Sequence, residues 1–306
     1  MPFWDPQFSS LFAWSSLGTS NYNAAQFLMR HTMSHGLQVD FSYTYSKSID
    51  LGSDTERVNT QGTTSTTSAI PLGTSTVMSY IANPWNPALN RAPSDFDLRH
   101  VITFDWVYEL PFGRGKAFAG DAGTLLDALI GGWQLSGLNR WSSAFPFSVI
   151  DNHGFTQNFL FNSNLVETAP IRSGLFMAGG SPYAFPGGGT IHTNPVVAGV
   201  LPIIGAPAAL APMRFAYPGE AGSRNNFRGQ GYFGIDAGLA KSWRIREGMS
   251  LKFSWEVFNV TNSVRFDTNT NTSLDNGSDD GGFAFGLYRR TLSVPRVQQF
   301  SLRLSF

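Results

Sequence analysis

Strict alternation of apolar and polar residues recurs along this chain and is its dominant pattern. A period of two is that of a β-strand, whose successive side chains point to opposite faces of a sheet. The alternation is clearest in "LQVDFSYTYS" from Leu37, "HVITFDWVYEL" from His100, "GIDAGLA" from Gly234, "LKFSWEV" from Leu251 and "RVQQFSLRLSF" from Arg296. Weaker strands are predicted near Phe8–Ser16, Tyr22–His31 and Trp133–Phe147, which makes about eight strands in all.

The connections between these strands alternate in length. Met33–Gly36 and Arg244–Gly248 are tight turns, and Pro111–Gly132 is a longer connection on the same side, with one short helical turn in "TLLDALIGG". Three long gaps rich in Ser, Thr, Asn, Gly and Pro fall on the other side: Ser48–Phe96, Ser148–Gly231 and about Asn262–Pro295. Loops this long are uncommon in a compact soluble domain. Short turns on one side and long loops on the other are typical of an outer-membrane barrel.

The alternation alone does not decide whether the apolar face meets a second sheet or lipid, because a β-sandwich alternates too. Strands of about ten residues have the length that a tilted strand needs to cross a bilayer. Aromatic residues near strand ends predict a girdle at the lipid headgroups. The side chains predicted to face lipid or to form this girdle are Tyr43, Tyr45, Phe104, Trp106, Tyr108, Trp133, Trp141, Trp243, Phe253 and Trp255. Those predicted to face a wet lumen are Asp40, Asp105, Asp236, Lys252 and Glu256.

The composition favours a β protein in contact with an apolar medium. Charged residues make up 14%, against roughly 25% in soluble globular chains. Lys plus Arg equals Asp plus Glu at 21 each, so no basic excess suggests nucleic acid as a partner. The absence of Cys excludes disulfides and thiolate metal sites. The uncharged stretch Val196–Met213 approaches the length of a membrane span, but its three prolines predict an extended loop.

No motif predicts an enzyme or a cofactor site. The five histidines form no HExxH pair, and no GxSxG elbow or P-loop is present. Asp267 begins a stretch like a calcium loop, but Thr272 replaces the required glycine and Ser278 the bidentate glutamate. A solvated acidic loop is therefore expected there, with no metal. The start, "MPFWDPQFSS", lacks the basic and apolar regions of a signal peptide.

Four stretches in order carry a resemblance to a known family. They are "GLQVDFSYTYSKSID" (Gly36–Asp50), "SDFDLRHVITFDWVYELPFGRGK" (Ser94–Lys116), "GGWQLSGLNRWSSAFPFSV" (Gly131–Val149) and "SLKFSWEVFNVTNSVRF" (Ser250–Phe266). The chain resembles the C-terminal barrel region of TonB-dependent outer-membrane receptors, particularly the Oar-like group with a carboxypeptidase-regulatory-like N-terminal domain. No such match covers the long loops.

This resemblance implies an all-β, antiparallel up-and-down meander of about eight transmembrane strands within a plugged barrel of about 22 strands. Residues 1–306 would form the C-terminal segment of that barrel, in the outer membrane of a Gram-negative type of cell. Such receptors take up scarce ligands such as metal chelates or glycans. The signal peptide, the plug and the TonB box are expected N-terminal to this chain, so the TonB complex would be reached only through that part.

The last strand carries an apolar ridge of Phe300, Leu302, Leu304 and Phe306. It resembles the signal that the barrel assembly machinery reads, although Ser301 and Leu304 stand where the common pattern has glycine and often an aromatic residue. In a finished barrel this strand would pair with the first strand.

Two alternatives remain open from the sequence. One is a soluble or surface-attached β-sandwich used for adhesion or carbohydrate binding. The other is a small closed barrel that acts as an anchor or passive pore. Small residues at Ser42, Gly238, Ser254 and Ser301 suit the wall of a wide lumen better than the packed interior of a small barrel. We therefore expect the isolated chain to form an open, curved sheet that transports nothing by itself.

Overall fold

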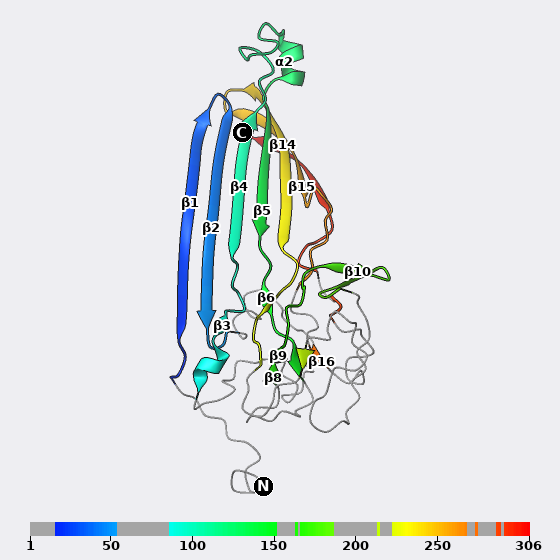
Figure 1. Cartoon of the computed structure of the whole chain (residues 1–306). Coiled ribbons are helices and arrows are strands. Elements are labelled where there is room, and N and C mark those ends of the chain that lie inside the picture. Colours follow the sequence, from blue (N-terminus) through cyan, green and yellow to red (C-terminus); the bar gives the residue numbers. More distant parts are fainter. Residues whose placement is uncertain are drawn as a thin grey trace, which may run out of the picture.

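One large antiparallel sheet dominates the computed structural model (Figure 1). The structure describes residues 16–53, 86–151, 163–164, 166–186, 213–214, 222–267, 273–274, 286–288 and 291–306. Seven long strands follow one another in the sheet: β1 (Ser20–Ser34), β2 (Leu37–Asp50), β4 (His100–Glu109), β5 (Trp133–Ser142), β14 (Tyr232–Arg246), β15 (Met249–Phe258) and β17 (Val297–Ser305). The eighth strand of the sheet, β3 (Ala92–Pro93), pairs with the end of β2.

The long strands form an up-and-down meander, because each pairs antiparallel with the long strand before it. The predicted all-β meander is therefore confirmed. Among the described residues only this sheet has long strands, whereas a sandwich would need two such sheets facing each other. The strand predicted near Phe8–Ser16 falls outside the described residues except for Ser16. β1 and β17 stand at the two ends of the strand order, and no pairing joins them in the part of the chain that the structure describes.

The two ends of the sheet differ, as the connection lengths predicted. At one end, called the turn end, β1–β2 and β14–β15 are joined by tight turns, and α2 (Thr124–Ile130) lies in the connection from β4 to β5 (Figure 1). The first turn uses the left-handed region at His35 (φ 51°) and Gly36 (φ 82°), and the second uses it at Gly248 (φ 76°). Glycine adopts this region without the steric cost that a Cβ brings.

The opposite end, called the loop end, carries short elements from the long connections. They are η1 (Pro87–Asn90), a 3₁₀ turn, and the paired short strands β6 (Pro146–Phe147) with β13 (Phe227–Arg228), β9 (Val166–Glu167) with β12 (Met213–Arg214), β10 (Phe176–Ala178) with β11 (Ser181–Tyr183), and β7 (Ile150–Asp151) with β8 (Ser163–Asn164) and β16 (Ser273–Leu274). We call the described part of these connections the cap.

Residues that lie opposite one another in neighbouring strands project to the same side of a sheet, so the register defines two faces. The face that contains Phe104 is called the apolar face, and the face that contains Asp105 is called the polar face. The apolar face carries Tyr43, Tyr45, Phe104, Trp106, Tyr108, Trp133, Trp141, Trp243, Phe253, Trp255, Phe300, Leu302 and Leu304. The polar face carries Asp40, Asp105, Asp236, Lys252 and Glu256. The predicted separation of the two sets is therefore present, while contact of the apolar face with lipid stays a prediction.

The buried apolar core lies in the cap and not under the sheet. Phe147, Phe185 and Phe227 are buried with ring centroids 5.2–5.8 Å apart. Nearby, burial raises the pKa of the Tyr288 phenol, whose hydroxyl donates to the carbonyl of Gly174 over 2.6 Å. Large side chains of the apolar face, such as Phe300 and Leu302, are instead exposed. An exposed apolar band of this extent marks a surface that meets another apolar phase.

Candidate functional site

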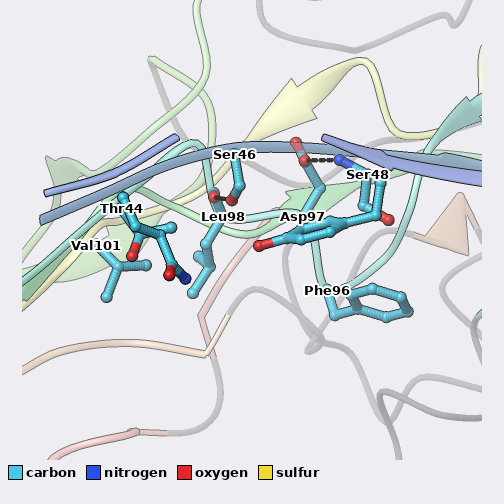
Figure 2. A pocket seen from close by; sticks show the side chains of 9 residues that line it. Thr44, Ser46, Ser48, Phe96, Asp97, Leu98 and Val101 are labelled. Carbon is cyan, nitrogen blue, oxygen red and sulfur yellow. Dashed lines mark hydrogen bonds between the residues drawn. The ribbon is translucent and has the colours of Figure 1, made fainter. Parts of the chain in front are cut away.

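A hollow of about 350 Å³ lies on the polar face at the loop end (Figure 2). β1, β2 and β4 supply its wall, and the segment before β4 covers part of it. The lining side chains are Tyr22, Gln26, Thr44, Ser46, Ser48, Phe96, Asp97, Leu98 and Val101. Most of these are hydroxyl, amide or ring groups, which offer hydrogen bonds and contact area without a free charge. Volumes of this size are typical of small-molecule sites.

One of the lining residues, Asp97, has a fully buried side chain that holds neighbouring segments in place. Its carboxylate accepts from the backbone N–H of Ser48 over 2.7 Å and from the guanidinium groups of Arg99 and Arg228. Arg228 also donates to the backbone carbonyl of Ala144 over 3.1 Å. Asp97 therefore ties β2, the segment before β4 and β13 together, and Arg228 extends this tie to the segment after β5. Asp97 is thus committed to structure rather than free for a ligand.

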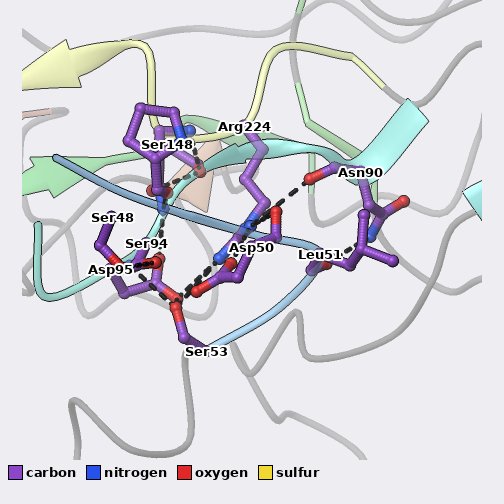
Figure 3. A network of polar contacts seen from close by, with 11 residues as sticks. Ser48, Asp50, Leu51, Ser53, Asn90, Ser94, Asp95, Ser148 and Arg224 are labelled. Carbon is purple, nitrogen blue, oxygen red and sulfur yellow. Dashed lines mark hydrogen bonds and ion pairs between the residues drawn. The ribbon is translucent and has the colours of Figure 1, made fainter. Parts of the chain in front are cut away.

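A second ion-pair network lies beside the hollow and is centred on Arg224 (Figure 3). Its side chain is only 5% exposed. Arg224 Nη1 donates to Asp50 Oδ1 over 2.8 Å, and Nη2 donates to Asp95 Oδ2 over 3.0 Å. A guanidinium that serves two carboxylates uses its planar fork of donors, which a lysine lacks.

Neighbouring polar groups complete the network around Asp95. Ser53 Oγ donates to Asp95 Oδ2 over 3.0 Å and accepts from the Asp95 backbone N–H over 2.9 Å. Asn225 Nδ2 donates to Asp95 Oδ1 over 2.5 Å and to the carbonyl of Pro93 over 2.8 Å. The Asn225 backbone N–H donates to Ser148 Oγ over 2.9 Å. These bonds fasten the segment before β13 to the segment after β6 and to β3 and the residues that follow it.

The Arg224 guanidinium stays protonated and positively charged at any ordinary pH. Burial acts to lower the pKa of this guanidinium, but the carboxylates of Asp95 and Asp50 outweigh it and raise that pKa above its ordinary value. A group whose pKa is higher in the folded state than in the unfolded state stabilises the fold fully at any pH below its unfolded-state pKa. This stabilisation is lost only as the pH rises through the folded-state pKa. Because the ordinary pKa of arginine already lies far above neutrality and that of Arg224 is raised further, this guanidinium adds no pH dependence near neutrality.

Aromatic side chains of the apolar face gather at both ends of the strands. At the loop end, Tyr43 and Tyr45 contact the His100 ring, with centroids 6.1 and 5.2 Å away, and Trp141 lies 6.3 Å from it. Tyr43 Oη and His100 Nδ1 are 2.9 Å apart. In mid-sheet, Trp106 lies over Gly137, where an added Cβ would come within 2.5 Å of the indole nitrogen. That close approach explains a glycine in the middle of β5.

At the turn end, the apolar face contains a lysine that the sequence interpretation did not place there. Lys241 lies opposite Trp133 and Phe253, and it is 2% exposed. Its ammonium lies 5.4 Å from the ring centroids of both Trp133 and Trp243 and donates to the carbonyl of Gly131. The cation is thus enclosed by two indole rings. The sequence predicted a strand only as far as Ala240, because Lys241 breaks the alternation of apolar and polar residues. In the structure, β14 continues to Arg246.

Sequence reasoning missed the cap network entirely. Arg224 is 174 residues from Asp50 and 129 from Asp95, so no local spacing connects them. In the sequence, the only indication of this network was that charged residues occur in these segments although the chain has few charged residues overall. Of the possible calcium ligands, Asp267 is buried, while Asn269, Asn271, Asp275, Asp279 and Asp280 lie outside the described residues. No group of three or more potential metal ligands occurs among the residues that the structure describes.

The comparisons with known proteins agree with this geometry. A family model described as "Outer membrane beta barrel domain" matches residues 1–299. No curated protein and no solved structure matches the chain. Within the described ranges no helix is long and apolar enough to cross a membrane. The stretch Val196–Met213 lies outside those ranges except for its last residue.

Proposed function

Because this chain belongs to the family of outer membrane β-barrel domains and its place is the outer membrane, we propose that it forms part of the wall of a TonB-dependent receptor. The receptor would take up a scarce ligand such as a metal chelate or a glycan. Its plug and its TonB-contacting segment would precede this sequence, so that the TonB complex acts through them. The chain itself would supply strands, loops and part of the ligand path.

The open sheet is the observation that carries this proposal. β1 and β17 each have one neighbour among the described residues, which suits strands that continue into a wider barrel. An eight-stranded barrel has an interior just wide enough for its own side chains to fill. Here the polar face carries small residues, namely Ser42, Ser136, Gly238, Ala240, Ser254 and Ser301. Small residues leave space for a wide lumen and for a plug inside it.

The cap supports uptake of a ligand rather than a bare pore. Buried ion pairs hold its segments against the polar face, and the hollow lies next to them. A passive channel needs no such ordered cover at its loop end.

Energy dependence is the decisive test of this proposal. Cells with the complete receptor gene and cells with the gene deleted would be compared for accumulation of labelled iron chelates and glycans. We expect at least one ligand whose accumulation is lost on deletion and also lost when a protonophore removes the inner-membrane energy. Accumulation that needs the gene but survives the protonophore would reject TonB coupling and favour a passive pore.

We further propose that the end of β17 is read by the barrel assembly machinery. β17 pairs only with β15 in the described residues, and Phe306 is 97% exposed beyond its end. Deleting Phe306 from the receptor should lower its level in outer-membrane fractions and leave unassembled protein in the periplasm. Phe306→Trp is the matched control, since it keeps an aromatic ring at this position. Normal outer-membrane levels after the deletion would show that the Phe306 ring is not part of the signal.

A further inference from the structure

The connection from β4 to β5, Pro111–Gly132, is held together by its own hydrogen bonds and exposes large apolar side chains. The Arg114 backbone N–H donates to Asp127 Oδ1 over 2.6 Å, and the Arg114 guanidinium donates to Ala122 O and Thr124 Oγ1. Gly113 packs so closely that an added Cβ would come within 2.6 Å of the Gly131 Cα. The segment is therefore an ordered unit.

The surface of this unit carries several large apolar side chains beside its charged ones. Leu125 is 90% exposed and Leu129 is 70% exposed, and none of the residues of α2 is buried. The two leucines are four residues apart and so lie on one side of the helix. Phe118, in the same connection, is 58% exposed and contacts the exposed Phe112 ring at 5.5 Å between centroids. Several large apolar side chains exposed together mark a surface that meets something other than water.

The apolar face of the sheet supplies the groups that hold the end of α2. Trp133 Nε1 donates to Leu129 O over 2.9 Å, and Trp243 Nε1 donates to Ala128 O over 2.7 Å. Lys241 donates to Gly131 O. The last carbonyls of a helix have no partner within the helix. Here they are satisfied by side chains from the apolar face, which suits a position from which water is largely excluded.

We propose that α2 is an interfacial anchor whose Leu125 and Leu129 insert into the phospholipid leaflet at the turn end of the barrel. The occupant is lipid because the leucines continue the apolar face past the indole pair Trp133 and Trp243. Amphipathic helices at such an interface bury their apolar side at the boundary of headgroups and acyl chains. The anchor rests on the apolar face meeting lipid and does not depend on which ligand the receptor takes up.

Site-directed spin labelling tests this anchor, and the cysteine-free sequence makes single labels simple. Nitroxides would be attached at Leu125→Cys and at Asp121→Cys, an exposed polar position in the same connection, with Leu129→Cys as a second reporter. The assembled receptor would be placed in bilayers of phosphatidylethanolamine and phosphatidylglycerol. Collision rates with dissolved oxygen and with a water-soluble nickel chelate would then be compared.

We expect the ratio of oxygen to nickel collisions to be several-fold higher at Leu125 and Leu129 than at Asp121. Equal nickel access at all three positions would overturn the anchor, because the leucines would then be in water. An immobilised Leu125 label that is shielded from both reagents would also overturn it, since that result indicates a protein partner on the helix.

Discussion

Replacing Phe104 with Arg is expected to destabilise the assembled barrel by about 2–4 kcal/mol, the range typical of a cation on the lipid face near the bilayer midplane. Phe104 is the fifth of ten residues in β4, and it lies opposite Phe41 and Asn139 on the apolar face. It is a cleaner site than Phe253, which lies opposite Lys241. An arginine at 253 would add repulsion from that lysine to the cost of contact with lipid.

The matched control is Val107→Arg, three residues away on the polar face. Val107 lies opposite Gln38 and Ser136, and we expect little loss there because a lumen-facing arginine keeps its water. Denaturant unfolding of the receptor in phospholipid vesicles would measure both variants. Similar losses at the two positions would mean that the two faces meet similar surroundings, so that the apolar face would not be the one in lipid.

The second large effect is expected at Arg224. Replacing it with Met should open the cap network at a cost of about 3–5 kcal/mol, because Asp50 and Asp95 are then left as buried charges without a partner. Both carboxylates are 8% exposed in their side chains. The loss should be local to the cap, since the sheet is stabilised by its own strand pairs.

Hydrogen exchange of the receptor would measure this loss at backbone N–H groups that the network holds. Asp95 N–H donates to Ser53 Oγ over 2.9 Å, and Asn225 N–H donates to Ser148 Oγ over 2.9 Å. Arg91→Met is the control, because Arg91 is exposed and its side chain donates to Asn21 Oδ1 at 3.3 Å, outside the network. Adding Asp50→Asn and Asp95→Asn to Arg224→Met should restore part of the protection. No recovery would show that the lost guanidinium packing, not the unpaired carboxylates, causes the effect.

The sheet was largely predictable because each strand carries its own evidence. Alternation over about ten residues fixes which side chains share a face, and a shift by one residue would move them all to the other side. β4 and β15 agree closely with their predicted bounds. Asn139 and Arg140, neighbours in β5, could not both suit one side, and the structure places Asn139 on the apolar face with its amide bonded to the Phe104 carbonyl over 3.2 Å.

The cap and the turn-end lysine were not predictable, and for physical reasons. The partners of Arg224 come from β2 and from the segment before β4, so the network exists only after segments far apart in sequence are brought together. Lys241 contradicts the simple pattern of its own strand, and the indole rings and the Gly131 carbonyl that accommodate it include groups from outside the local sequence. Local periodicity contains no information on either arrangement.

The most direct test of the central claim is the water accessibility of successive positions along β4 in native outer membranes. Single cysteines at Ile102, Thr103, Phe104, Asp105, Trp106 and Val107 would be treated with a small, membrane-impermeant maleimide. A sheet whose apolar face meets lipid should be labelled at Thr103, Asp105 and Val107, and protected at Ile102, Phe104 and Trp106 until detergent is added. Uniform labelling along the strand, or alternation of the opposite phase, would contradict a membrane wall with this orientation.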